Sequence, residues 1–102
     1  MKNYDKLVRD RIPEIIEADG KSCDVIIASK EEMSELLERK LMEEVNEYLE
    51  DKNLEELADI MEVLFGLAHN LGYSEEDLLE KRKAKCEERG GFKEGIVLKG
   101  VK

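Results

Sequence analysis

Five acidic residues stand in a pattern that could support chemistry. They fall in the stretch EEVNEYLEDKNLEELAD, at Glu43, Glu44, Glu47, Glu56 and Asp59. Glu44 and Glu47 are three residues apart, and so are Glu56 and Asp59. An α-helix would place the two side chains of each such pair on one face. Burying even one unpaired carboxylate costs several kcal/mol, and neighbouring like charges raise that cost. If these acids face inward, they must be partly protonated, pair with Lys or Arg, or bind a cation.

A cation site built from these residues would offer only carboxylate oxygens. Such a donor set suits a hard divalent ion, with Mg²⁺ as the usual choice and Mn²⁺ as an alternative. The sequence has no cluster of His and Cys that would suit zinc. A Mg²⁺ ion held in this way keeps bound waters and takes substrate phosphates as further ligands. The pattern therefore indicates phosphoryl chemistry, in which the metal stabilises charge and can activate a water.

The same acids also have purely structural interpretations. Glu56 is three residues after Asn53, so its carboxylate could complete a capping box at the start of a helix. Lys40 lies one turn before Glu44 and could neutralise it within the same helix. The functional alternative for Lys40 is contact with a substrate phosphate.

Two central helices must position the acids. Ser29 followed by Glu32 forms a capping box and predicts a long helix over 30–51. Asn53 then caps a second helix that runs to about Leu71. Because the turn between them is short, we expect the two helices to pack antiparallel.

Helical periodicity predicts that four of the acids face the interior. At about 100° per residue, the first helix has an apolar face formed by Met33, Leu37, Leu41, Val45 and Tyr48. Glu44 falls near the middle of that face, Glu47 lies at its edge and Glu43 points further out. In the second helix Glu56 lies inside a wide apolar arc, and Asp59 lies at its rim. Antiparallel packing would bring the four inward acids together.

The apolar arc of the second helix is too wide for one neighbour. Its members are Leu57, Ile60, Met61, Val63, Leu64, Leu67, Ala68 and Leu71. The 102 residues fit a single domain over 1–102, and helices of this size make only a thin core. We therefore expect an all-α helical bundle completed by oligomerisation, as a homodimer or homotetramer.

The flanking segments add smaller elements. RDRIPEIIEADG predicts a short helix, with Pro13 in its first turn. CDVIIAS is a β-branched run that predicts a strand, and GIVL near the end could pair with it in a small two-stranded β ribbon. Arg9, Asp10 and Arg11 could anchor the first segment over the cleft of a neighbouring subunit, or form a charge network at the helix start.

A third helix, EEDLLEKRKAKCEER, carries the main basic cluster. Ser74 caps it, and it ends at Gly90. One face of this helix holds Lys81, Lys85 and Arg89. These residues could bind a triphosphate beside the metal, or they could oppose the helix dipole in the last turns.

Composition excludes some functions. The net charge of −9, from 26 acids and 17 bases, disfavours binding to nucleic acid or to an anionic membrane. No apolar run approaches the roughly 18 residues that span a bilayer, and MKNYDKLVRD has no apolar core of a signal peptide. Cys23 and Cys86 are isolated, which together with these features predicts a cytoplasmic protein.

The motifs KLMEEVNE and EELAD resemble the EExxE…ExxD pattern of the MazG-like nucleotide pyrophosphohydrolase superfamily. The opening YDKLVRDRIPEIIEADG and the closing KRKAKCEERGGF look like the termini of its small stand-alone members, so the resemblance covers most of the chain. It implies an all-α, Mg²⁺-dependent enzyme in which water attacks the α-phosphate of a nucleoside triphosphate, giving a monophosphate and pyrophosphate. Carried over by position, the metal-binding and catalytic residues are Glu44, Glu47, Glu56 and Asp59.

The substrate stays open between two classes. The short gap between Glu47 and Glu56 is closer to the phosphoribosyl-ATP pyrophosphohydrolases of histidine biosynthesis. Those proteins place an aromatic residue and a His soon after the last acid, where this chain has Met61 and Glu62. We therefore expect nucleoside triphosphates, including noncanonical ones, with phosphoribosyl-ATP as the alternative. A helical interaction module without activity is the alternative from a different class.

Overall fold

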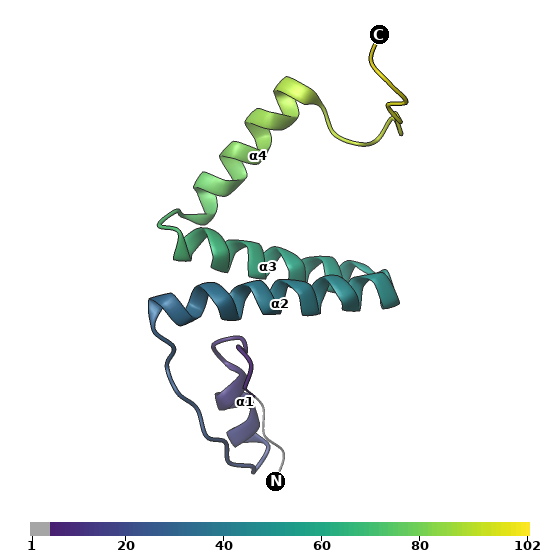
Figure 1. Cartoon of the computed structure of the whole chain (residues 1–102). Helices are drawn as coiled ribbons and strands as arrows, with labels where there is room; N and C mark the ends of the chain where they lie inside the picture. Colours follow the sequence, from purple (N-terminus) through teal and green to yellow (C-terminus); the bar gives the residue numbers. More distant parts are fainter. Residues whose placement is uncertain (1–4) are drawn as a thin grey trace.

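The chain forms four α-helices in a computed structural model that describes residues 5–102 (Figure 1). The helices are α1 (Ile12–Ala18), α2 (Lys30–Asp51), α3 (Leu54–Asn70) and α4 (Glu75–Arg89). The predicted all-α class is confirmed. The helices α2 and α4 match their predicted ranges, α3 ends about one residue before its predicted end, and α1 is shorter than the predicted segment over 9–20. None of these helices combines the length and the apolar composition needed to cross a membrane.

Local capping explains why α2 and α4 begin where they do. Ser29 Oγ accepts a hydrogen bond from the Glu32 N–H at 3.2 Å, and the Glu32 carboxylate accepts one from the Ser29 N–H at 3.0 Å. Ser74 and Asp77 make the same reciprocal pair at α4. Each box satisfies two backbone donors that the first helical turn would otherwise leave unpaired.

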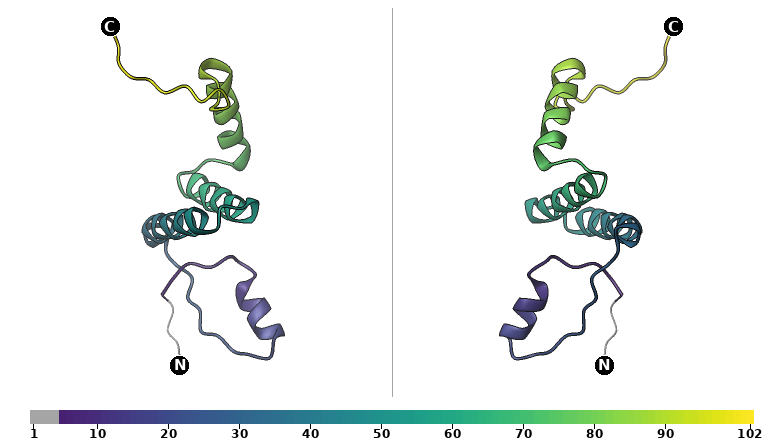
Figure 2. Two further views of the ribbon diagram at one scale, coloured as in Figure 1. Left: turned by 90° about the vertical axis from the view of Figure 1, so that its right-hand side faces the viewer. Right: turned by 90° about the vertical axis from the view of Figure 1, so that its left-hand side faces the viewer.

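The turn between α2 and α3 makes them a helical hairpin. Lys52 ends α2 in the left-handed region at φ 49°, and Asn53 caps α3 by accepting a hydrogen bond from the Glu56 N–H at 2.9 Å. Two residues suffice to reverse the chain, so α2 and α3 lie side by side and antiparallel (Figures 1 and 2).

The hairpin core is small. Among the described residues, the buried apolar side chains are Leu37, Val63 and Ala68, which are 4%, 7% and 8% exposed. A Cβ atom at Gly66 would stand 2.9 Å from Leu37 Cδ2, so a glycine at this position allows α2 and α3 to approach closely. The core therefore fixes the two central helices and little else.

The remaining helices extend away from the hairpin (Figure 2). α4 contacts α3 alone, and α1 packs against none of the other helices. The radius of gyration is 17.7 Å, against about 13 Å for a compact domain of this length. The accessible surface is 9585 Å², against roughly 5,900 Å² for a compact chain of 11.8 kDa. A single chain therefore leaves much of its apolar surface in contact with solvent.

The predicted β ribbon is wrong for this chain. Residues 23–29 and 95–98 form no strand, and in the first segment Ile26 and Ile27 are 85% and 93% exposed. The first segment leads into α2, whereas the second follows α4, which carries it to the opposite end of the molecule (Figure 1). A β-branched run becomes a strand only when a partner strand is within reach, and helix packing here keeps the two apart.

Replacing Leu37 by Ala tests whether this small core holds the hairpin together. Because Leu37 is 4% exposed, we expect Leu37→Ala to lower the free energy of unfolding by about 2–5 kcal/mol. Leu54→Ala is the matched control, since Leu54 is 81% exposed. Urea unfolding followed by circular dichroism measures both, and equal losses in the two variants would contradict the assigned core.

Candidate metal centre

Three carboxylates from the hairpin converge between α2 and α3. Glu44 lies on α2, Glu56 lies in the first turn of α3, and Asp59 follows one turn later. Each offers one oxygen, and these three oxygens lie within 4.8 Å of one another. We call these three residues the acid cluster. Their convergence follows from helical spacing on α3 and from the antiparallel approach of α2.

Two oxygens of the acid cluster lack hydrogen-bond partners. Glu44 Oε2 and Glu56 Oε2 are both buried, and no described residue bonds to either. The Glu44 side chain as a whole is only 9% exposed. Buried polar atoms almost always have a partner, because an unsatisfied one costs about 1–3 kcal/mol and more when charged. The two unpaired oxygens can therefore accept a proton, a water or a cation.

Lys40 neutralises one side of the acid cluster. Its Nζ lies 3.3 Å from Glu44 Oε1 and 3.5 Å from Glu43 Oε2. The Lys40 side chain is only 17% exposed, so water screens these contacts less than it screens surface pairs. Lys40 thus pairs with Glu44 Oε1, while Glu44 Oε2 has no hydrogen-bond partner among the described residues.

Arg9 approaches the acid cluster from outside the hairpin. Its Nη2 donates to Asp59 Oδ1 at 2.6 Å, and its Nη1 lies 4.0 Å from Glu62 Oε1 on the same helix. These contacts join residues about fifty positions apart in the sequence. The segment before α1 is therefore fixed against α3 by its charge.

Electrostatics show that the acid cluster resists full ionisation. Burial is the main cause that raises the pKa of Glu44, and hydrogen bonding and charge from Glu47 add to the rise, while Lys40 opposes it. Desolvation also raises the pKa of Glu56, followed by the negative charge of Asp59. A bound dication would remove the repulsion that causes part of these shifts.

Glu56 does not serve the helix cap with its side chain. Asn53 caps α3 through the backbone N–H of Glu56, but the Glu56 carboxylate does not complete the box with a return bond. In α2, by contrast, Glu32 does make the return bond to Ser29. The carboxylate of Glu56 is therefore directed to the acid cluster, and the capping-box interpretation of that side chain is wrong.

The other predicted acids have different positions. Glu47 is exposed and lies next to Glu44, outside the group of three converging oxygens. Glu43 lies outside the acid cluster and is half-buried rather than pointing out to solvent, because it pairs with Lys6 at 3.4 Å and with Lys40. Of the four acids predicted to face inward, Glu44, Glu56 and Asp59 converge, and Glu47 lies outside them.

The predicted basic face lies elsewhere in the chain. It consists of Lys81, Lys85 and Arg89, all of them exposed on α4. α4 starts beyond the end of α3 that is remote from Glu56, and it leads away from the hairpin (Figure 1). Triphosphate binding by this face stays a prediction, and it would require α4 from a second copy to approach the acid cluster.

Sequence reasoning missed the role of Arg9. Arg11 does form the predicted charge network at the helix start, with Nε 3.4 Å from Glu14 Oε2. Arg9 instead reaches α3 within the same chain. No local signal separates the two arginines, because the path of the chain before α1 decides which of them meets Asp59.

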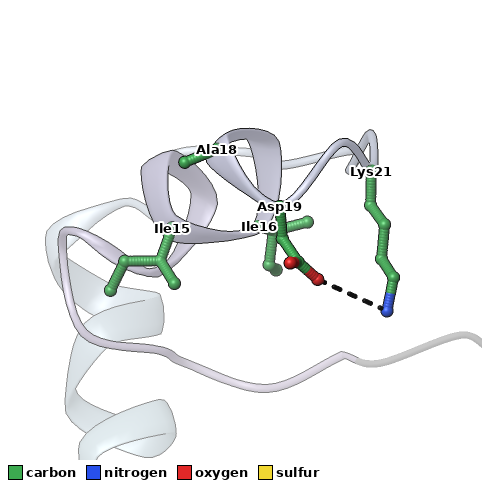
Figure 3. A pocket seen from close by; sticks show the side chains of 5 residues that line it. All are labelled: Ile15, Ile16, Ala18, Asp19 and Lys21. Carbon is green, nitrogen blue, oxygen red and sulfur yellow. Dashed lines mark ion pairs between the residues drawn. The ribbon is translucent and has the colours of Figure 1, made fainter.

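A shallow hollow on α1 is separate from the acid cluster. It is lined by Ile15, Ile16, Ala18, Asp19 and Lys21 (Figure 3). Its lining residues all come from α1 and the turn after it, where Lys21 Nζ lies 3.9 Å from Asp19 Oδ2. The hollow contains none of the converging acids, so it does not form part of the candidate site.

Comparison of the chain with protein-family models, curated proteins and solved structures found no match. The chemistry of the acid cluster is therefore inferred from its own donors. Three carboxylates, two of which have an unpaired buried oxygen, lie beside one lysine and one arginine and can hold a hard divalent cation.

Stability should depend on pH in a direction set by the raised pKa values. The pKa values of Glu44 and Glu56 exceed the ordinary 4.5 in the folded protein, so the folded state binds more protons than the unfolded state above that pH. The contribution of these two groups to stability is then largest below their ordinary pKa and is lost as the pH rises through the folded values. We expect the melting temperature in chelator to increase as the pH is lowered from neutral toward 4.5.

The double variant Glu44→Gln/Glu56→Gln should remove this increase, because neutral amides do not titrate. Glu50→Gln is the control on the exposed part of α2. Saturating Mg²⁺ should also suppress the increase in the unmodified protein, since protons and metal compete for the same oxygens. A melting temperature that falls on acidification equally in all three proteins would contradict the assignment.

Proposed function

We propose that the protein is a Mg²⁺-dependent nucleoside triphosphate pyrophosphohydrolase of the MazG-like type. Water attacks the α-phosphate, the bond to the β-phosphate breaks, and the products are a nucleoside monophosphate and pyrophosphate. The observation that carries this proposal is the pair of buried, unpartnered oxygens, Glu44 Oε2 and Glu56 Oε2, beside Asp59. Substrate phosphates commonly complete the ligand shell of a Mg²⁺ ion held by a few carboxylates.

The residues of the hairpin divide into roles. Glu44, Glu56 and Asp59 would hold the metal, and Mn²⁺ would fit the same oxygen donors. The bound ion would supply Lewis-acid stabilisation of the charge that develops on the phosphate. Lys40 holds one oxygen of Glu44 at 3.3 Å and so fixes the orientation of that carboxylate.

Glu47 is the residue left to accept a proton from the attacking water. It lies beside Glu44 but outside the three converging oxygens, and it is exposed to solvent. A carboxylate in that position can orient a water next to the metal without serving as a ligand itself. This differs from the resemblance, which makes Glu47 a metal ligand.

The proposed enzyme works as a homodimer or a larger homo-oligomer. Leu57, Met61 and Leu64 form a stripe along α3 that is 42%, 49% and 39% exposed, and Met42 and Leu49 on α2 are 68% and 58% exposed. A second copy that covers these stripes would complete a helical bundle. The excess of accessible surface over that of a compact chain supports such a partner.

Product analysis tests the reaction. The protein is incubated with Mg²⁺ and a panel of common and noncanonical nucleoside triphosphates, together with phosphoribosyl-ATP, in water enriched in ¹⁸O. We expect equal amounts of monophosphate and pyrophosphate, with ¹⁸O in the monophosphate. Release of inorganic phosphate, or ¹⁸O in pyrophosphate, would contradict attack at the α-phosphate. Hydrolysis of phosphoribosyl-ATP alone would assign the alternative substrate.

Glu56→Gln links the activity to the acid cluster. It preserves the shape of the side chain but removes its charge. We expect kcat to fall by at least about a hundredfold, since groups that merely support metal ligands are already worth 10–100-fold. Circular dichroism should show an intact fold, and Glu50→Gln should retain full activity. Normal turnover by Glu56→Gln would place the activity outside the acid cluster, whereas no turnover by the wild type would leave the interaction module as the better account.

A further inference from the structure

Arg9 occupies an unusual place among the basic residues of the described chain. Its guanidinium contacts Asp59, a member of the acid cluster, at 2.6 Å, yet its side chain is 52% exposed. Lys40 also contacts the acid cluster, but its side chain is 17% exposed and lies between Glu43 and Glu44. Arg9 is therefore the basic residue at the acid cluster that can both reach a metal ligand and contact a molecule arriving from solvent.

The segment that carries Arg9 contacts both helices of the hairpin. Lys6 Nζ lies 3.4 Å from Glu43 Oε1, which fixes the segment against α2. A small hollow between them includes Lys6, Lys40 and Glu43 in its lining. Arg9 itself contacts α3. The segment thus runs from Glu43 on α2 to Asp59 on α3, which places the exposed Arg9 side chain next to one of the three converging acids.

Charge balance indicates what Arg9 does when a dication binds. The three carboxylates of the acid cluster are compensated in full by one dication together with Lys40. Asp59 then directs its charge to the metal, and the guanidinium of Arg9 loses the shorter of its two carboxylate contacts and keeps the 4.0 Å contact with Glu62. A guanidinium presents several N–H donors in a planar fork that matches phosphate oxygens, and such charge-assisted bonds are among the strongest hydrogen bonds in proteins.

We propose that Arg9 is the phosphate-binding residue of this site: it pairs with Asp59 until a dication takes that carboxylate, and it then binds the phosphate of the metal-bound ligand. The ligand class is a phosphate ester or anhydride that carries at least two adjacent phosphate groups. This inference rests on the proposed metal site and assigns to Arg9 the contact that the sequence had suggested for the basic face of α4.

Two opposite effects of one substitution test the inference. Arg9→Gln should strengthen Mg²⁺ binding about two- to fivefold, because an exposed ion pair that competes with the metal is worth up to about 1 kcal/mol. The same change should weaken binding of inorganic pyrophosphate to the Mg²⁺-saturated protein by about tenfold or more, because a bond to a charged phosphate is lost. Both constants are measured by isothermal titration calorimetry after treatment with chelator.

Two further variants keep the test specific. Arg11→Gln removes the same charge two residues away, where the side chain is 80% exposed and pairs with Glu14, so it should change neither constant appreciably. Arg9→Lys keeps the charge but loses the planar fork, so its pyrophosphate affinity should lie between those of the wild type and Arg9→Gln. Circular dichroism checks that each variant is folded.

Several results would overturn the inference. Pyrophosphate affinity of Arg9→Gln within twofold of the wild type would do so, as would weaker Mg²⁺ binding, because Arg9 would then only order the carboxylates. If Arg11→Gln changed both affinities as much as Arg9→Gln does, the lost net charge would explain the result and no specific role of Arg9 would be needed. If Arg9→Gln shows both expected changes in affinity but the wild type hydrolyses no triphosphate, the proposed reaction fails and this inference stands. If the wild type binds no Mg²⁺, both fail.

Discussion

Repulsion among inward-facing carboxylates is the constraint on which the rest of this structure depends. Glu44 is buried between two helices, and Glu56 and Asp59 converge on it from the facing helix. Two of the oxygens have no hydrogen-bond partner among the described residues. A purely structural hairpin would be more stable with apolar groups at these positions. The arrangement could therefore hold a cation that offsets this repulsion.

The hairpin is built to hold this arrangement in place. A two-residue turn through Lys52 and Asn53 makes α2 and α3 antiparallel, and Gly66 lets the helices approach beside Leu37. Positions on two packed helices are fixed more firmly than positions on loops. The remainder of the chain contributes little to this core, so the apolar stripes of α2 and α3 are exposed in a single chain.

Features set by neighbouring residues could be predicted from the sequence. Helix starts at Ser29, Asn53 and Ser74 depend on bonds spanning three residues, and the inward direction of Glu44 and Glu56 depends only on helical periodicity. The convergence of the acids then followed from one short turn. The convergence of these acids could be predicted because each inference used only residues close together in the sequence.

Features set by distant packing could not be predicted in the same way. The segment around Ile26 has the composition of a strand, but the direction of α4 keeps its expected partner at the opposite end of the molecule. The contact of Arg9 with Asp59 depends on how the chain before α1 folds back, which no local pattern records. For the same reason, a basic face on α4 says nothing about which surface it meets.

Direct titration with Mn²⁺, followed by electron paramagnetic resonance, tests the central claim most simply. The chelator-treated protein should show saturable Mn²⁺ binding that Mg²⁺ displaces. Glu44→Gln should weaken this binding by more than about tenfold, because a ligand should be worth at least as much as its supporting groups. Glu50→Gln, on the exposed part of the same helix, should bind like the wild type. Equal binding by the wild type and Glu44→Gln, or no saturable binding at all, would contradict a metal site in the acid cluster.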